Sequence, residues 1–323
     1  MIDFDLPKSL IAQAPASPRD HARLLVYNRR TKRITDDYFY NLLKHLPNPT
    51  LVVVNNSKVE HCRMLFDGGK KELFVVEGVN DKTVRALVRP GKVFRLGKTV
   101  QLSHAVLATV TAIDEEGIRT IQFNVARDHP DLLAAQHVPL PPYIKQNDAL
   151  AAEYQTIYAK TVGSKAAPTA GLHFTDQLKQ RVQAERDWAE VTLHVSLGTF
   201  ASLTEENFKT GRLHEESYEI AETTAQKIAA AEHVTAVGTT SVRTIESAAN
   251  SQQLSGSTDI FIQPGYSFKR VNALVTNFHL PGTSLLLLVE AFVGSGDELQ
   301  YIYDHAIKET YRFYSFGDAM LLL

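Results

Sequence analysis

Hydrophobic and polar positions change their period along the chain, and this change divides it into two kinds of structure. Between about Arg63 and Val125, short runs of strand-forming residues alternate with turns that contain glycine. The predicted strands are Glu72–Glu77, Thr83–Arg89, Thr99–Ser103, Ala105–Ile113 and Ile118–Val125, separated by Gly68-Gly69, Gly78, Pro90-Gly91, Gly97 and Gly117. Strands at this spacing are typical of a small all-β sheet or barrel.

After about Tyr154, predicted strands alternate with predicted helices, which indicates an α/β fold with a mostly parallel sheet and flanking helices. The predicted strands are Glu190–Val195, Val234–Val237, Asp259–Ile262 and Ala273–Thr276; the predicted helices follow Thr175, begin at Ser241, and cover Thr223–Glu232, Thr283–Phe292 and Glu298–Thr310. The uninterrupted apolar run Leu51–Val54 suits a central strand of that parallel sheet. We therefore predict a discontinuous α/β domain, residues 1–60 and 151–323, into which a barrel-like all-β domain, residues 61–150, is inserted.

The composition limits the class of protein. The chain has 323 residues, of which 44% are hydrophobic and 22% charged, as in a globular protein with two cores. A single cysteine, Cys62, excludes an internal disulfide framework and fits a reducing cytoplasm. Asp3 and Asp5 near the start do not suit a secretion signal. The longest apolar run, Leu285–Val289 extended to Phe292 across Glu290, is too short to span a bilayer. We expect a cytoplasmic protein without membrane contact and, because no heptad pattern is present, a monomer.

Basic residues are unevenly placed, although the net charge is only −2. The stretch from Lys82 to Ile113 contains no acidic residue. Its basic residues include Arg85, Arg89, Lys92 and Arg95, and a second basic cluster comprises Arg29, Arg30, Lys32 and Arg33. Such patches on a nearly neutral protein are expected of a phosphate-backbone binder. Lysine and arginine that keep strand edges soluble would give the same pattern, so both interpretations stay open.

Two loops combine histidine, proline, glycine and an aromatic residue. One is Ala166–Thr175, which contains Pro168 and His173, and the other is Thr276–Thr283, which contains Asn277 and His279. Binding and proton-transfer groups often lie on such loops, which indicates an enzyme. A third loop, Gly238-Thr239-Thr240, joins a predicted strand to a predicted helix that carries Arg243, and the free N–H groups of a helix N-terminus bind anions or hydroxyls.

Residues 191–200, at the end of a predicted strand, have polar side chains at alternate positions: Thr192, His194 and Ser196. Alternate residues of a strand share one face, which suggests a ligand surface. A core histidine bonded to the backbone explains His194 almost as well. His214 and Glu216, two residues apart, could serve as a base and its orienting partner or could lie in a solvated loop. No phosphate-loop or dinucleotide glycine motif occurs, and no close histidine pair suggests a metal site.

Motifs along nearly the whole chain resemble the S-adenosylmethionine:tRNA ribosyltransferase-isomerase family. They are DFDLP from Asp3, LIAQ from Leu10, Arg19-Asp20, PLPPYI from Pro139, AAPTAGLHFT from Ala166, TLHVSLGTF from Thr192, VGTTSVRTIES from Val237, TDIFIQPGY from Thr258, TNFHLP from Thr276 and YRFYSFGDAM from Tyr311. The basic stretch from Lys82 falls where this family has its β-barrel domain. The resemblance therefore agrees with the inserted domain predicted above.

The resemblance implies a reaction of queuosine biosynthesis. The ribosyl part of S-adenosylmethionine is transferred to 7-aminomethyl-7-deazaguanine at the tRNA wobble position and isomerised, which gives epoxyqueuosine and releases adenine and methionine. S-adenosylmethionine is consumed as a cosubstrate, so we expect no resident cofactor and no metal. The sulfonium acidifies the neighbouring ribose C5′ protons; the site then needs a base there, a proton donor for adenine and a dry pocket.

The residues expected to act fall into three sets. The catalytic candidates are His173, His194, His214, Glu216 and His279; the substrate-binding candidates are Pro168, Thr169, Gly171, Phe174, Thr239, Thr240, Arg243, Tyr266, Asn277 and Phe278; the tRNA-contacting candidates are Arg85, Arg89, Lys92 and Arg95. We expect His173 and His194 to flank the reacting ribose. Phe174, Tyr266 or Phe278 would face the sulfonium or stack on a base.

The chain also departs from the family pattern. Where the family commonly has Asn-Asp-Thr-Arg-Val, this chain has Asn55-Asn56-Ser57-Lys58-Val59, so an acid is lost and a planar guanidinium becomes a point charge. Gln263 replaces an aromatic residue and Leu213 replaces a methionine. One alternative is therefore a catalytically silent tRNA-binding protein on the same scaffold. Another is an enzyme that acts on a free nucleoside.

Overall fold

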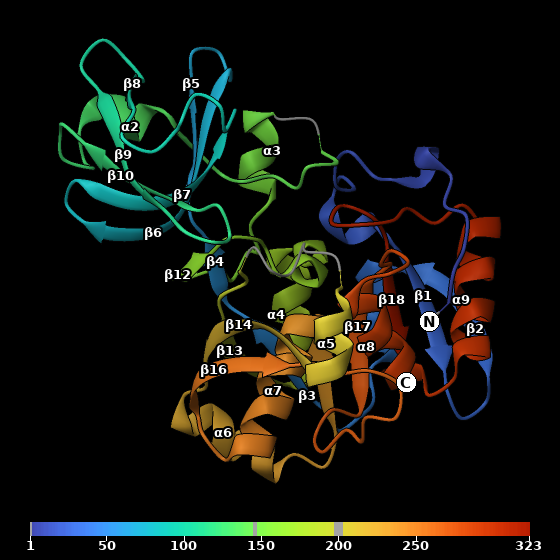
Figure 1. The fold of residues 1–323 in the computed structure, drawn as a ribbon. Coiled ribbons are helices and arrows are strands. Elements are labelled where there is room, and N and C mark those ends of the chain that lie inside the picture. The colour runs from blue at the N-terminus through green and yellow to red at the C-terminus, as the bar shows by residue number, and fades with distance from the viewer. Residues whose placement is uncertain (1, 145–146, 197–202) are drawn as a thin grey trace. The chain divides into compact units, whose positions relative to one another are not determined.

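The computed structural model describes residues 2–144, 147–196 and 203–323 (Figure 1). They form two compact units, one of residues 1–59 with 141–323 and one of residues 60–140. The described residues of the range 141–150, expected in the insertion, belong to the first unit. Tyr143 accounts for this, because its hydroxyl is 2.5 Å from Ser315 Oγ and its ring packs on Tyr314 with the centroids 4.1 Å apart.

The first unit is built on a nine-stranded sheet. Its strands, in spatial order, are β16 (Ser255–Ile260), β14 (Arg212–Glu219), β13 (Asp187–Leu193), β3 (Leu51–Asn55), β15 (Val234–Val237), β17 (Ala273–Asn277), β18 (Ala319–Leu322), β1 (Arg23–Asn28) and β2 (Arg33–Tyr38). The pairs β13–β3, β3–β15, β15–β17 and β18–β1 are parallel. The other four pairs are antiparallel, so the sheet is mixed and not mostly parallel as expected; three of its four parallel pairs lie at the centre.

Strand β3 occupies the central position that its apolar sequence predicts. All five of its residues are buried, and both of its neighbours run parallel to it. Leu51 and Val53 belong to one hydrophobic cluster, whereas Val52 and Val54 belong to another. Because successive side chains of a strand point to opposite faces, the sheet separates two cores.

Helices and short 3-10 turns complete the first unit. The α-helices are α1 (Leu42–His45), α3 (Asp148–Glu153), α4 (Asp176–Glu185), α5 (Glu205–Thr210), α6 (Glu222–Ala230), α7 (Thr239–Ser251), α8 (Ser284–Val293) and α9 (Gly296–Lys308); the 3-10 turns are η1 (Lys8–Leu10), η2 (Arg19–His21), η3 (Phe39–Asn41) and η4 (Thr169–His173). Thr175 and Thr283 cap α4 and α8 by accepting from Leu178 N and Leu286 N. Side-chain caps of this kind explain why both starts were predictable from sequence. No helix among the described residues is long and apolar enough to cross a membrane.

Two short strands, β4 (Ser57–Val59) and β12 (Thr161–Ser164), pair in parallel beside the large sheet. Gly163 in β12 has φ +148°, and a Cβ there would lie 2.8 Å from the ring of His194. Only glycine permits this close approach of backbone to the imidazole.

The second unit is a seven-stranded antiparallel sheet. Its strands, in spatial order, are β11 (Gln136–His137), β5 (Arg63–Phe66), β6 (Lys71–Asn80), β7 (Thr83–Arg89), β10 (Arg119–Phe123), β9 (Leu107–Ile113) and β8 (Thr99–Gln101), with the helix α2 (Pro130–Ala134). Alternating residues such as Val84, Ala86, Ala108 and Val110 point into its core. The predicted small all-β unit is thus present. Within the described residues β11 and β8 are edges, so the sheet is open rather than a closed barrel.

Candidate active site

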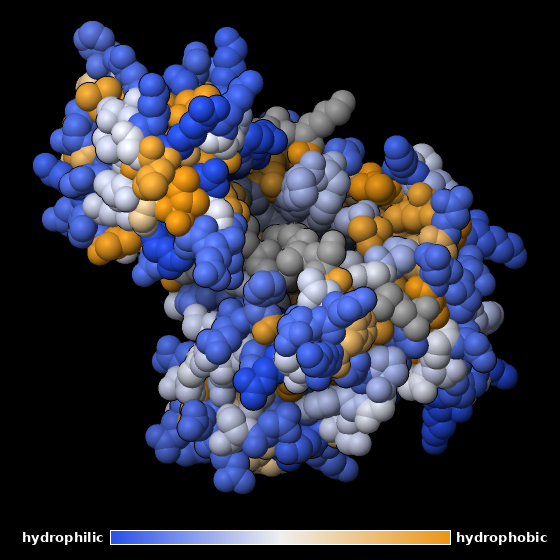
Figure 2. Space-filling model, in the orientation of Figure 1, coloured by the Kyte–Doolittle hydropathy of each residue, from blue (hydrophilic) through white to orange (hydrophobic). Residues whose placement is uncertain are grey.

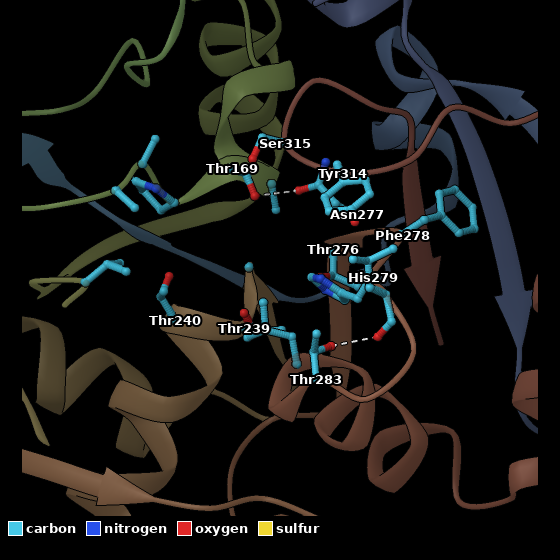
Figure 3. Close-up of a pocket in the computed structure, with 18 of the residues that line it drawn as sticks. Thr169, Thr239, Thr240, Thr276, Asn277, Phe278, His279, Thr283, Tyr314 and Ser315 are labelled. Carbon is cyan, nitrogen blue, oxygen red and sulfur yellow. Dashed lines mark hydrogen bonds between the residues drawn. The ribbon is translucent and has the colours of Figure 1, made fainter. Parts of the chain in front are cut away.

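A cavity of about 430 Å³ lies at the carboxyl ends of the parallel neighbours β15 and β17 (Figure 3). Open α/β sheets bind ligands at this edge. Three loops with sequence motifs supply most of the wall: 166–170, 238–240 and 276–283. The lining residues are Pro142, Tyr143, Tyr154, Ala166, Ala167, Pro168, Thr169, Ala170, Val195, Gly238, Thr239, Thr240, Thr276, Asn277, Phe278, His279, Leu280, Pro281, Gly282, Thr283, Leu285, Tyr314 and Ser315.

Asn277 joins two of these loops through its side-chain amide. Thr169 Oγ1 donates to Asn277 Oδ1 at 2.9 Å (Figure 3), and Asn277 Nδ2 donates to His173 Nε2 at 3.1 Å. His173 is buried, and this burial lowers its pKa to about 4. At neutral pH its ring is therefore uncharged, with Nε2 as an acceptor and the proton on Nδ1. His173 itself is not among the lining residues; it lies behind Asn277 and fixes that amide.

His279 is the expected catalytic residue that the structure places in the cavity wall (Figure 3). Its Nε2 lies 2.9 Å from Thr276 Oγ1, and its backbone N–H donates to the Tyr303 hydroxyl at 2.9 Å. Burial lowers the pKa of His279 to about 4. A neutral imidazole at this position can accept a proton from a bound substrate.

His194 follows β13 and lies just outside the cavity wall. Its backbone N–H donates to Ser217 O at 3.0 Å, and its ring packs on Gly163. The next residue, Val195, lines the cavity. The expected polar row continues with Thr192, whose Oγ1 donates to Asn56 Oδ1 at 2.8 Å. The rest of that motif, Leu197–Phe200, lies outside the described residues.

The expected pair of His214 and Glu216 is separated by burial. His214 is exposed on β14, whereas Glu216 is buried. Arg243 Nη1 donates to Glu216 Oε2, and Ser196 N donates to Glu216 Oε1 at 2.7 Å. Glu216 therefore orients Arg243 and the segment at Ser196. Arg243 lies one turn into α7, behind the lining residues at the start of that helix.

Three expected substrate-binding residues lie in packed positions instead of the wall. Phe174 is fully buried, with T-shaped contacts to Phe39 and Trp188. Tyr266 donates to Glu246 Oε2 at 3.0 Å and packs against Phe268. A Cβ on Gly171 would lie 2.0 Å from the Tyr158 hydroxyl, so this glycine lets η4 pack closely. Phe174 and Tyr266 do not line this cavity, so their expected facing toward a ligand has no support from their positions.

Part of the wall is aromatic and was not predicted from the sequence. Tyr143, Tyr154 and Tyr314 line the cavity. Phe278 also belongs to the wall, but its ring is fully buried and packs on Tyr303, Tyr311 and Phe313, so its expected facing toward a ligand has no support from its position. Tyr143 lies in the motif from Pro139 and Tyr314 in the motif from Tyr311. Both are aromatic motif residues outside the predicted core strands, and this was the signal by which they could have been predicted as wall residues.

The segment that departs from the family pattern forms a buried polar network. Asn55 Oδ1 accepts from Ser57 N at 3.0 Å and from Leu193 N at 3.1 Å. Asn56 Nδ2 donates to Glu190 Oε2 at 3.3 Å. These bonds connect β3 to β13 and satisfy the amides, whereas Lys58 is exposed.

The basic residues of the second unit differ in their neighbours. Arg85 pairs with Glu77 at 3.2 Å and with Asp114 at 2.8 Å, and Arg89 pairs with Glu72 at 3.0 Å. The stretch is acid-free in sequence but not in space, because β6 and the turn at residue 114 bring acids to it. Lys92 and Arg95 are exposed. Figure 2 shows hydrophobic residues among the hydrophilic ones on this unit, and the exposed hydrophobic residues there include Val79, Leu87, Leu96, Leu107 and Ile113.

Comparison with known proteins adds independent information. The model of a family described as "Queuosine biosynthesis protein" matches residues 1–322. The chain is 43% identical over 350 residues to the S-adenosylmethionine:tRNA ribosyltransferase-isomerase of Solibacter usitatus, covering 99% of this chain and 98% of that protein. It is 41% identical over 332 residues to the protein of the same name from Thermotoga maritima, with the same coverage.

A solved structure described as S-adenosylmethionine tRNA ribosyltransferase from Thermotoga maritima shares the fold. It is 35% identical, the match covers 99% of both chains, and the TM-score is 0.58. The chain therefore belongs to the queuosine biosynthesis protein family.

Proposed function

We propose that this protein is an S-adenosylmethionine:tRNA ribosyltransferase-isomerase. It transfers and isomerises the ribosyl part of S-adenosylmethionine onto 7-aminomethyl-7-deazaguanine at the tRNA wobble position, giving epoxyqueuosine, adenine and methionine. The observation that carries this proposal is the convergence of three motif loops on one cavity in a chain that matches the family over residues 1–322. No observation favours the silent tRNA-binding alternative.

The cavity has features that this reaction requires. Its described lining includes no Lys, Arg, Asp or Glu, so a bound sulfonium would lie in a largely apolar space. Tyr143 and Tyr314 are partly exposed residues of the wall, and aromatic rings attract a cation. A low-dielectric wall also strengthens each polar contact that the substrate makes there.

We assign the proton acceptor for the ribose C5′ proton to His279. It lines the cavity, and the lowered pKa keeps its ring neutral at physiological pH. His173 acts through Asn277 as a positioning residue, because it accepts a hydrogen bond from the Asn277 amide, which in turn accepts one from the Thr169 hydroxyl. His194 is the candidate donor of a proton to departing adenine, since its neighbour Val195 lines the cavity.

The proposal extends to the RNA and to the state of the protein. Lys92 and Arg95 on the second unit would contact tRNA phosphates, and Arg85 and Arg89 would contribute less because acids already pair with them. The target base would be splayed from a single-stranded loop, where unstacking is cheap. We propose a cytoplasmic monomer, in keeping with a tRNA substrate, without a resident metal or cofactor because the sulfonium itself supplies the leaving group.

The test is release of adenine from S-adenosylmethionine by the purified protein. tRNA that carries 7-aminomethyl-7-deazaguanine should support release, and the same tRNA with guanine should not. Tight binding of the modified tRNA without adenine release would support the silent binder. Adenine release with a free nucleoside, undiminished by competing tRNA, would support the nucleoside enzyme.

A further inference from the structure

Helix α7 begins at the cavity without a side chain to cap it. Its N-cap is Gly238, which has no capping side chain, and its first turn contains no acidic residue. The first N–H groups of a helix have no partner within the helix and carry partial positive charge. Thr239 and Thr240, the first two residues of α7, line the cavity (Figure 3).

The hydroxyl of Thr240 gives a second, independent indication of a ligand. Thr240 is only 9% exposed, and its Oγ1 has no hydrogen-bond partner among the described residues. Figure 3 shows this hydroxyl directed into the space between α7 and the loops above it. Ser241 and Thr244 on the same helix instead donate to the carbonyls of Val237 and Thr240, at 2.7 Å and 2.9 Å. Buried hydroxyls normally have partners, so Thr240 is prepared for one that binds.

The second helix that starts at the cavity does not offer such a site. The N-cap of α8, Thr283, accepts from Leu286 N at 3.3 Å and donates to Leu280 O at 2.8 Å. The chain itself therefore satisfies the Thr283 hydroxyl and one of the first N–H groups at that end. Among the residues that the structure describes, the start of α7 differs from that of α8 in two ways: it has no side-chain cap, and it carries the Thr240 hydroxyl without a hydrogen-bond partner.

The geometry points to the N-terminus of α7, with the Thr240 hydroxyl, as the binding site for the α-carboxylate of S-adenosylmethionine. This inference rests on the proposed function and adds how the cosubstrate is oriented in the cavity. With no basic residue in the described lining, the helix terminus is the feature there that attracts an anion. A tRNA phosphodiester fits less well, because the two nucleosides that flank it would have to enter the cavity with it.

This placement sets the orientation of the whole cosubstrate. With the carboxylate at Thr240, the sulfonium extends toward the aromatic residues of the wall. The ribose then lies toward the loop of Asn277 and His279, which Figure 3 shows across the cavity from Thr239 and Thr240. The site thus explains how an unreactive end of the cosubstrate positions C5′ for the base.

The test compares S-adenosylmethionine with decarboxylated S-adenosylmethionine, which keeps the sulfonium and loses the carboxylate. Their dissociation constants are measured by calorimetry on full-length protein saturated with unmodified tRNA. Wild type should bind the decarboxylated compound at least roughly 10-fold more weakly, the usual effect of losing a hydrogen bond to a charged group. Thr240→Val should weaken the binding of S-adenosylmethionine by a similar factor and leave the dissociation constant of the decarboxylated compound unchanged.

Two further variants separate the hydroxyl from packing. Thr240→Ser, which retains the hydroxyl, should keep most of the affinity for S-adenosylmethionine. Thr244→Val makes the same substitution one turn later, outside the described wall, and should preserve the preference for the carboxylate. Thermal melting of each variant confirms that it is folded.

Four outcomes overturn the inference. Equal binding of the two compounds by a wild type that still releases adenine would refute the carboxylate site and leave the proposed function intact. If Thr240→Val weakened the binding of both compounds equally, the carboxylate site would also be refuted. A Thr240→Val protein that lost affinity for tRNA alone would refute it too and would indicate that the helix terminus binds a tRNA phosphate. A wild type that neither binds S-adenosylmethionine nor releases adenine would overturn both proposals.

Discussion

His173 and Asn277, 104 residues apart, share a buried hydrogen bond in which Asn277 Nδ2 donates to His173 Nε2 at 3.1 Å. The bond fixes the Asn277 amide, whose oxygen accepts a hydrogen bond from the Thr169 hydroxyl. Two loops of the cavity wall are therefore held in one arrangement. Because the imidazole is neutral, the interaction needs no compensating charge in the core. This pair connects the fold of the protein to the chemistry proposed for it.

Replacing His173 separates a positioning role from a merely structural one. His173→Leu leaves the buried Asn277 amide without an acceptor, which should cost about 1–3 kcal/mol of unfolding free energy. We expect kcat to fall roughly 10-fold or more while the KM for S-adenosylmethionine changes little, since His173 is not in the wall. His173→Gln, which supplies an oxygen acceptor, should recover much of both losses. Equal behaviour of the two variants in steady-state kinetics would contradict the role.

His279→Ala should remove the proton acceptor. We expect kcat for adenine release to fall roughly 100-fold or more, the usual scale of acid–base catalysis. The dissociation constant of S-adenosylmethionine should change far less, because the anchoring groups proposed lie on α7. A near-normal kcat in a folded variant would reassign the base, and His194→Ala measured beside it would show whether that residue takes the role.

Acidification should destabilise the protein through His173 and His279, whose pKa values are lowered. The pKa values of His173 and His279 are lowered to about 4 from 6.5, so the unfolded chain binds more protons than the folded one between these values. Their contribution is complete above pH 6.5 and is lost as the pH falls toward 4, by up to about 1.4 kcal/mol per pH unit for each histidine. Urea unfolding from pH 7 to pH 4.5 measures this slope. In His173→Gln the slope should decrease by one histidine's share, and an unchanged slope would mean that His173 titrates normally.

The buried pair of Arg243 and Glu216 should be required as a pair. Their side chains are 6% and 2% exposed, so removing one partner leaves an uncompensated buried charge. Arg243→Ala or Glu216→Ala should each lower the unfolding free energy by about 3–5 kcal/mol. The double variant should be less destabilised than the sum of the two, as measured by a double-mutant cycle in denaturant. Strict additivity would show that the two side chains do not interact.

The exposed cations of the second unit should contribute to tRNA binding more than the paired ones. Lys92→Ala with Arg95→Ala should weaken binding and lower the salt dependence by roughly one unit of slope for each phosphate that the protein no longer neutralises. Arg85→Ala with Arg89→Ala removes the same charge but also frees Glu77, Asp114 and Glu72. Binding measured over a range of salt concentrations compares the two double variants. An unchanged slope in both would make these residues solvated strand edges.

Local signals explain which parts of the fold were predictable. The strands Thr83–Arg89 and Val234–Val237 have the predicted bounds, and caps such as Thr175 mark helix starts. The antiparallel strand pairs were not predicted. Whether β2 folds back on β1, and whether β18 runs against β17, depends on tertiary packing and not on the local hydrophobic pattern of each strand.

The candidate site followed the same rule. Loops at strand ends predicted Thr239, Asn277 and His279, which the structure brings together. The aromatic wall draws Tyr143 and Tyr314 from distant segments of the chain, a proximity that no local pattern contains. Phe174 and Tyr266 resemble ligand contacts in sequence because they lie beside a histidine or a glycine, but hydrophobic burial places Phe174 in the core. Sequence alone could not distinguish these two uses of an aromatic residue.

The most direct test of the proposed activity is mass analysis of the wobble nucleoside after reaction with S-adenosylmethionine labelled in its ribose. We predict that tRNA bearing 7-aminomethyl-7-deazaguanine gains the labelled ribosyl group, with one adenine released for each nucleoside changed. Neither event should occur in the His279→Ala protein above roughly 1% of the wild-type rate. An unlabelled wobble nucleoside in wild type, whether or not adenine is released, would contradict the proposed transfer.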